Sequence, residues 1–182
     1  LVDRGVHPLA YRLMCLSAHY RSELEFTWDG LGAALTRLKR LVQGIEGLSG
    51  RAGGEQKGDT QPYRARFTEA LDEDLNTAKA LTVLDELLAD KRLSVDTRLA
   101  ALADFDRALG LELPSLTRAA LRIRPADATI DEAAIEARLA ERKDARASKD
   151  FARSDAIRDE LAGAGVEVMD GDPLGWDWKL GL

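Results

Sequence analysis

Basic side chains recur at helical spacing in the last third of this 182-residue chain. Arg138, Arg142, Arg146 and Lys149 are separated by four, four and three positions, so at about 100° per residue they fall within one narrow arc of a helix. Cations stacked on one stripe repel one another, and the pattern therefore suits a surface that meets an anion. The alternative is a solvated face on which carboxylates such as Glu141 pair with the arginines and nothing binds.

Aromatic residues follow this basic stripe. The run GVEVMDGDPLGWDW predicts a strand and a hairpin, with Trp176 and Trp178 on one side and Asp177 on the other. A cationic surface beside aromatic rings is typical of sites that bind unpaired RNA bases and their phosphates.

The charge of the whole chain differs from the charge of this segment. The formal net charge is −6 and the isoelectric point about 5.1, which argues against a uniformly basic nucleic-acid binder. Residues 138–158, however, contain seven cations and four anions and are net positive by three. The chain is therefore at most a local RNA binder and not a uniform one, and we expect no DNA partner.

Composition indicates a helical globular protein. Hydrophobic residues make up 45% and aromatic residues only 5%, while Ala, Leu, Arg and Glu are abundant, so helices are favoured over a large sheet. No apolar run is long enough to span a membrane, and we expect no membrane partner. Cys15 is the only cysteine, which excludes an internal disulfide and favours a cytoplasmic location; its neighbours LMCL predict a buried position.

Residues suited to catalysis are scarce. His7, His19 and Cys15 are not clustered as zinc ligands would be, and no glycine motif of the phosphate-cradling or dinucleotide-binding kind is present. The acidic run at 72–74 splays around a helix axis instead of converging, so we expect a capping or solvated role. No catalytic residue and no metal site are predicted.

Apolar periodicity predicts five helices before the basic stripe. They extend from Pro8 through the SEL at 22–24, from Thr27 to about Gly44, from Tyr63 to Leu71, from Asn76 or Thr77 through Leu88, and from Val95 to Leu109. We expect an antiparallel bundle over 1–114, interrupted by a mobile glycine-rich loop at 44–62.

The remaining chain predicts a second domain. Pro114 and Pro125 mark 115–128 as a linker, and 129–182 should form a small mixed α/β domain. Thr129 and Glu132 match a capping box that opens the basic helix, and Asp150 is the expected N-cap of the next helix. The overall fold class is mainly α.

Three blocks of sequence, in order, resemble the cysteinyl-tRNA synthetase family. GVHPLAYRLMCLSAHYRSELEFTWDGL is similar to the segment after that family's KMSKS loop, and FTEALDEDLNTAKAL resembles its F-x-x-A-M-x-D-D-x-N-T-x-x-A-L motif. RKDARASKDFARSDAIRDEL followed by GVEVMDGDPLGWDW resembles its C-terminal end, with one extra residue and one extra tryptophan. The blocks cover nearly the whole chain and are specific as a set.

The resemblance implies an anticodon-reading site in the last domain. By position, the residues expected to contact RNA are Arg146, Phe151, Asp155, Asp170 and Trp178, supported by the basic stripe of Arg138, Arg142 and Lys149. The HYR triplet at 19–21 could also touch RNA; the alternative is that Tyr20 packs and Arg21 pairs with a carboxylate such as Glu25. Phe151 could equally belong to a helical core.

The resemblance also implies a larger enzyme. Because the chain opens at Leu1 inside a family-like block and lacks the family's HIGH-type and KMSKS-type motifs, we expect a monomeric C-terminal fragment that is inactive alone. Its implied partners are cysteine tRNA and the protein's own N-terminal catalytic domain, where ATP, magnesium and zinc would act. Two alternatives remain open: a related cysteine ligase of mycothiol synthesis, and a helical interaction module.

Overall fold

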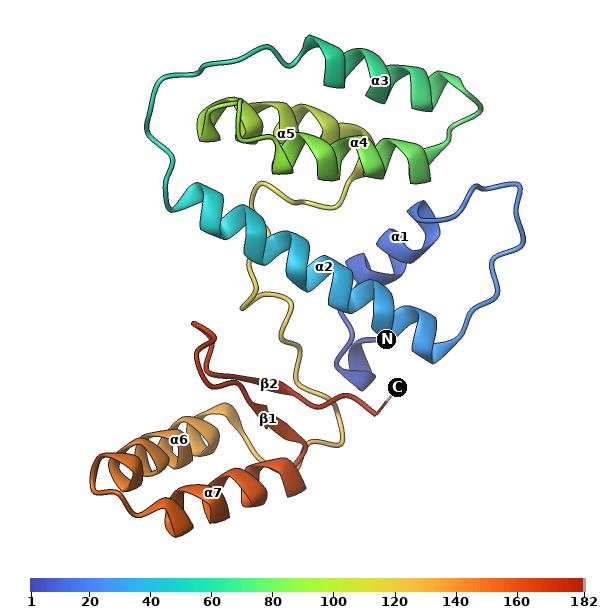
Figure 1. Cartoon of the computed structure of the whole chain (residues 1–182). Helices are drawn as coiled ribbons and strands as arrows, with labels where there is room; N and C mark the ends of the chain where they lie inside the picture. Colours follow the sequence, from blue (N-terminus) through green and yellow to red (C-terminus); the bar gives the residue numbers. More distant parts are fainter. Residues whose placement is uncertain (182) are drawn as a thin grey trace. The chain divides into compact units, whose positions relative to one another are not determined.

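The computed structural model describes residues 1–181 and divides the chain into two compact units (Figure 1). Pro8–Leu121 form a helical unit, and Leu1–His7 join the chain from Arg122 onward in a C-terminal unit. This division differs from the expected domains. Leu116 and Leu121 are buried in the helical unit, and the backbone N–H of Ala126 donates to the carbonyl of Asp3, which ties the first residues to the second unit.

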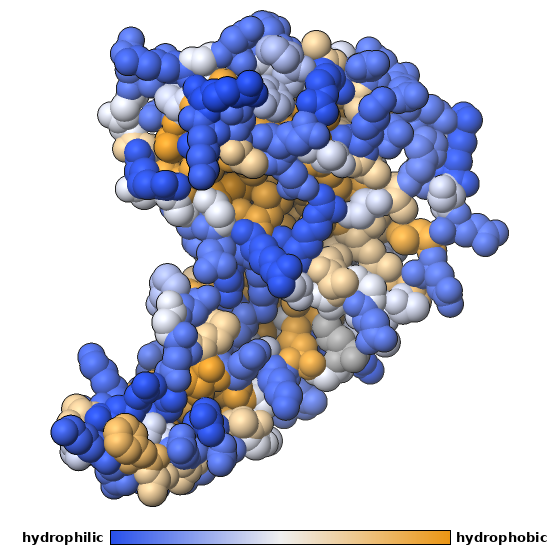
Figure 2. All heavy atoms as spheres, in the orientation of Figure 1, coloured by the Kyte–Doolittle hydropathy of each residue, from blue (hydrophilic) through white to orange (hydrophobic). Residues whose placement is uncertain are grey.

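The helical unit is an antiparallel assembly of amphipathic helices, as expected. Its helices are α1 (Pro8–Leu16), α2 (Trp28–Ser49), α3 (Gln61–Asp72), α4 (Thr77–Ala89) and α5 (Val95–Leu109). The side chains of Thr27, Asn76 and Ser94 each accept a hydrogen bond from the first turn of the helix that follows. The apolar faces pack inward, while hydrophilic side chains cover most of the face drawn in Figure 2.

Two helix ends differ from the sequence-based expectation. Helix α2 continues past Gly44 because Ile45 and Leu48 extend its buried face, which offsets the roughly 1 kcal/mol cost of a helical glycine. Helix α1 ends at Leu16, so the HYR triplet lies in an irregular segment instead of a helix.

The glycine-rich loop is shorter and better anchored than expected. Both carboxylate oxygens of Asp96 accept from the backbone N–H groups of Gly53 and Gly54, at 2.9 and 3.0 Å, and the Ser94 hydroxyl accepts from the Lys57 N–H at 3.0 Å. The loop is therefore tied to the first turn of α5.

Cys15 is exposed, so the expectation of a buried cysteine was wrong. The buried face of α1 is formed by Ala10, Leu13 and Met14, which turns the next residue toward solvent.

The C-terminal unit contains α6 (Glu132–Ala147), α7 (Phe151–Gly163) and an antiparallel hairpin of β1 (Val166–Val168) and β2 (Trp176–Trp178). In the hairpin Val166 pairs with Trp178 and Val168 with Trp176. Its core consists of Ile135, Ile157, Leu161, Val166, Trp176 and Trp178. Asp131, not Thr129, accepts from Ala134 as the N-cap of α6, whereas Asp150 caps α7 as expected.

Candidate nucleic-acid interface

Helices α6 and α7 lie side by side, joined by a tight turn, and the loop between the two strands runs past α6 (Figure 1). This loop, residues 169–175, and one face of α6 line a groove of about 460 Å³, whose lining includes Arg142, Lys143, Asp170 and Pro173. The α6 face brings Arg142 and Lys143 to the groove and the loop brings the Asp170 carboxylate, so the site is assembled from distant parts of the sequence.

Asp170 is shared by two arginines that are one helical turn apart. Arg142 Nη1 and Nη2 donate to Asp170 Oδ1 and Oδ2 at 2.8 and 2.9 Å, which is a bidentate pair. Arg146 Nη1 lies 3.1 Å from Asp170 Oδ1. Arg142 is only 7% exposed, whereas the Arg146 side chain is 50% exposed. The structure therefore separates a buried arginine from an accessible one.

These contacts control ionisation at the site. The hydrogen bonds from Arg142, aided by the charges of both arginines, lower the pKa of Asp170 to about 2. The same contact, together with a smaller attraction from Asp155, raises the pKa of Arg142. Asp170 is thus a stable anion at neutral pH and can act only as a hydrogen-bond acceptor.

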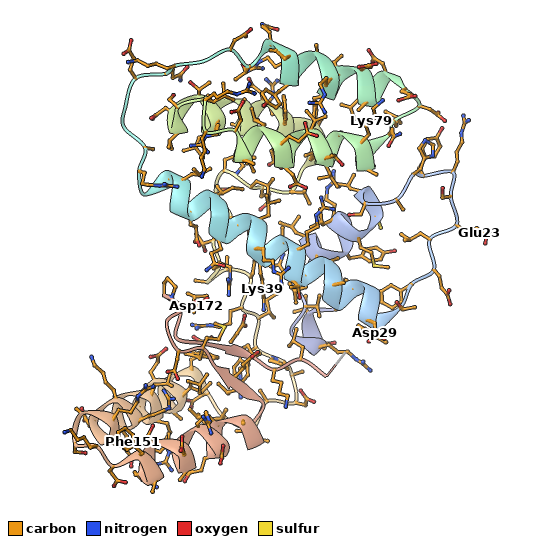
Figure 3. The ribbon with its side chains drawn as sticks, in the orientation of Figure 1. Glu23, Asp29, Lys39, Lys79, Phe151 and Asp172 are labelled. Carbon is orange, nitrogen blue, oxygen red and sulfur yellow. The ribbon has the colours of Figure 1, made fainter. Side chains whose placement is uncertain are left out.

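Asp155 and Phe151 project from α7. The Asp155 side chain is exposed and its Oδ1 lies 3.6 Å from Arg158 Nη1. Phe151 begins the helix, and at 63% exposure it is excluded from the core (Figure 3). A bare aromatic ring next to a turn is available for stacking.

The two tryptophans have a different role from the expected one. Trp178 is 4% exposed and Trp176 is fully buried, and their rings meet edge to face at 5.2 Å in the core. Placing Trp178 among the residues that stack on RNA therefore conflicts with its burial. Asp177 is buried as well, so the expected split into an inner and an outer side of the strand does not hold.

Trp176 is fixed by two residues that sequence reasoning missed. The guanidinium of Arg122 lies 3.8 Å from the centre of the indole ring, and the indole N–H donates to Glu136 at 2.7 Å. No motif in the sequence marks either partner, because their contacts depend on how the hairpin packs.

Only part of the basic stripe presents accessible positive charge in the fold. Arg138 pairs with Glu141 and Glu160, so that end of the stripe is an internal ion-pair network. Lys149 lies outside α6, in the turn, with a positive φ of 62°. Lys143 and Lys149 make no ion pair within residues 1–181, and with Arg146 they provide the accessible positive charge.

The HYR triplet forms a separate cluster in the helical unit. The Tyr20 hydroxyl donates to Asp74 Oδ1 at 2.6 Å, and Arg21 Nη1 lies 3.0 Å from Asp74 Oδ2. Arg21 thus pairs with Asp74 instead of Glu25, and Tyr20 is exposed instead of packed. Of the acidic run, Glu73 pairs with Lys79, consistent with a solvated surface role.

Comparison with known proteins first defines the class. The model of the cysteinyl-tRNA ligase anticodon binding domain matches residues 132–173, which include α6, α7 and the strand loop up to Pro173. A second model, the DALR domain, matches residues 66–111 in the helical unit. The chain is therefore an anticodon-binding region.

Individual relatives then define the family. The chain is 61% identical to a cysteine–tRNA ligase of Novosphingobium aromaticivorans over 99% of its own length, which is 37% of that relative. It is 43% identical to the cysteine–tRNA ligase of Zymomonas mobilis, with 98% of this chain and 41% of the relative covered. The chain belongs to the cysteine–tRNA ligase family and spans well under half the length of these relatives.

No helix within residues 1–181 is long and apolar enough to cross a membrane. No group of three or more His, Cys, Asp or Glu side chains in that same part of the chain could hold a metal ion.

Proposed function

We propose that the C-terminal unit binds the anticodon loop of cysteine tRNA and thereby positions this RNA for cysteinylation by the whole ligase. The observation that carries the proposal is the Arg142–Asp170–Arg146 cluster, and the exposed Phe151 at the start of α7 supports it. The cluster lies on α6 and the strand loop, inside the segment that matches the anticodon-binding model.

The chemistry of these side chains suits unpaired bases. The half-exposed guanidinium of Arg146 can donate two parallel hydrogen bonds to a guanine edge, and Asp155 and Asp170 can accept from the amino groups of cytosine or adenine. A base stacked on Phe151 would contribute about 1–3 kcal/mol. Lys143 and Lys149 can attract phosphates.

The remaining chemistry would take place elsewhere in the ligase. Family resemblance implies ATP, magnesium and a zinc-bound cysteine thiolate, but the donor set of residues 1–181 does not fit a zinc site, since Cys15 has no clustered ligand partners. We therefore assign these groups to a catalytic domain in the part of the relatives that this chain does not span. That domain would be the covalent partner of this chain. We further propose that the protein is monomeric and cytoplasmic.

The alternatives are less well supported. A mycothiol-pathway cysteine ligase has no anticodon to read, whereas residues 132–173 match an anticodon-binding model. A helical interaction module that binds no RNA would not account for the exposure of Phe151 and Arg146.

The test is a binding titration of the full 182-residue chain with cysteine tRNA and with the same tRNA carrying an altered anticodon, over a series of salt concentrations. We expect tighter binding to the native anticodon, weakened by salt. Arg146→Ala should remove the preference. Equal binding to both RNAs by the wild-type chain and by a complete ligase would overturn the proposal.

A further inference from the structure

Arg142 differs from its neighbour Arg146 in what it can reach. Both terminal nitrogens of Arg142 are engaged by Asp170, at 2.8 and 2.9 Å. Its Nε is also buried, and it has no hydrogen-bond partner within residues 1–181. Because Arg142 is only 7% exposed, the N–H groups that Asp170 does not use are shielded from an incoming base or phosphate.

Asp170 has the opposite character. Its side chain is 59% exposed, although it belongs to a short strand loop and carries a charge that two arginines attract. The loop itself is held by hydrogen bonds from the Met169 N–H to the Gly175 carbonyl and from the Leu174 N–H to Asp172. A fixed backbone and a bidentate partner together leave the Asp170 carboxylate one orientation.

The two arginines contribute unequally to the lowered pKa of Asp170. Hydrogen bonding to Arg142 is the largest cause of the lowered Asp170 pKa, whereas the hydrogen bond from Arg146 is the smallest. Arg146 makes a single contact at 3.1 Å and its side chain is half-exposed. Arg146 can therefore leave Asp170 without leaving the carboxylate uncompensated.

We infer that Arg142 is a positioning residue of the anticodon site: it holds Asp170 as an oriented acceptor, so that Arg146 is free to exchange its contact with Asp170 for one with an RNA base. This inference rests on the proposed function and extends it, because it assigns base discrimination to a residue that touches no base. It also explains the spacing of four positions between the arginines: one turn of α6 separates the buried Arg142, which holds Asp170, from the accessible Arg146, which would contact the base.

The first experiment uses cysteine tRNA and its single-base anticodon variants with the full chain. Arg142→Gln should lower the discrimination at one anticodon position by about tenfold, the range of one good bidentate contact. The slope of log Kd against log salt should stay unchanged, because no phosphate contact is lost. Asp170→Asn should lose discrimination at the same position, and the double variant should lose no more than either single one.

The controls separate positioning from folding. Arg153→Gln removes another carboxylate-paired arginine from the same helical hairpin and should keep discrimination. Arg142→Lys keeps the charge but not the bidentate geometry, so it should fold and show a partial loss. A uniform loss of affinity for all anticodons in Arg142→Gln, with the salt slope reduced by about one, would identify a phosphate contact and overturn the inference.

A second measurement needs no RNA and therefore separates this inference from the proposed function. The pKa of Asp170, followed by carboxyl NMR, should rise from about 2 toward its ordinary value in Arg142→Gln, and rise much less in Arg146→Ala. Equal rises in the two variants would overturn the inference even if the chain reads anticodons. Failure of wild-type discrimination with unequal rises would instead count against the proposed function alone.

Discussion

The two units bury charged side chains for different purposes. In the helical unit Asp106 is buried and accepts from the N–H groups of Leu111 and Leu113 at 3.0 and 3.1 Å, and Arg98 donates to the carbonyl of Leu88 at 2.9 Å. In the C-terminal unit the buried Arg142 instead holds an exposed carboxylate. A buried charge that satisfies the backbone stabilises the fold, whereas one that holds a surface group fixes the orientation of that group.

Within the C-terminal unit, the core and the surface also carry different aromatic residues. Trp176 and Trp178 fill the core, while Phe151 is exposed at the turn. Substitutions should therefore affect stability or RNA affinity, but rarely both.

The largest effect is expected for Trp178→Ala. Removing a buried indole should lower the free energy of unfolding of the C-terminal unit by about 3–5 kcal/mol. Urea denaturation followed by circular dichroism checks it, with Phe151→Ala as the matched aromatic control. A stable Trp178→Ala chain that binds tRNA more weakly would show that Trp178 does contact RNA.

Asp106→Ala should destabilise the helical unit by about 2–3 kcal/mol, because two buried N–H groups lose their acceptor. Asp104→Ala on the same helix removes only a partly exposed pair with Arg64 and should cost less than about 1 kcal/mol. Thermal and urea unfolding of both variants provide the comparison. Equal losses of unfolding free energy in the two variants would mean that the burial of Asp106 adds nothing to stability.

Phe151→Ala should weaken binding of cysteine tRNA by about 1–3 kcal/mol through the loss of stacking. Its free energy of unfolding should change by less than about 0.5 kcal/mol, since the ring is mostly exposed. Fluorescence titration and urea denaturation measure the two quantities. A stability loss larger than the binding loss would place Phe151 with the core aromatics.

The smallest effect concerns pH. The pKa of Asp170 is lowered to about 2 in the folded chain, so its ion pair stabilises the fold above the ordinary carboxyl pKa, and this stability is lost as the pH falls toward 2. Because the side chain is more than half exposed, the contribution should be under about 1 kcal/mol. Asp170→Asn should flatten the acid limb of unfolding free energy against pH, and Asp159→Asn, an exposed carboxylate on α7, should flatten it less.

Local patterns were sufficient for much of the fold. The leucine periodicity of α2 and α4, the caps at Thr27, Asn76 and Asp150, and the β1–β2 hairpin follow from neighbouring residues, and the structure confirms them. The end of α2 at Ser49 was missed because the burial of Ile45 and Leu48 depends on tertiary packing, and the end of α1 at Leu16 was missed as well.

The sequence by itself determined the residue types of the site and the family to which they belong. Spacing placed Arg142 and Arg146 on one helical face, and motif order indicated an anticodon-binding region. Only the tertiary structure decided which arginine is the buried anchor, that Trp178 is core and Phe151 is surface, and that Asp170 joins two residues on α6. The physical reason is that burial and ion pairing depend on which segments meet, and Asp170 reaches Arg142 across 28 positions of the chain.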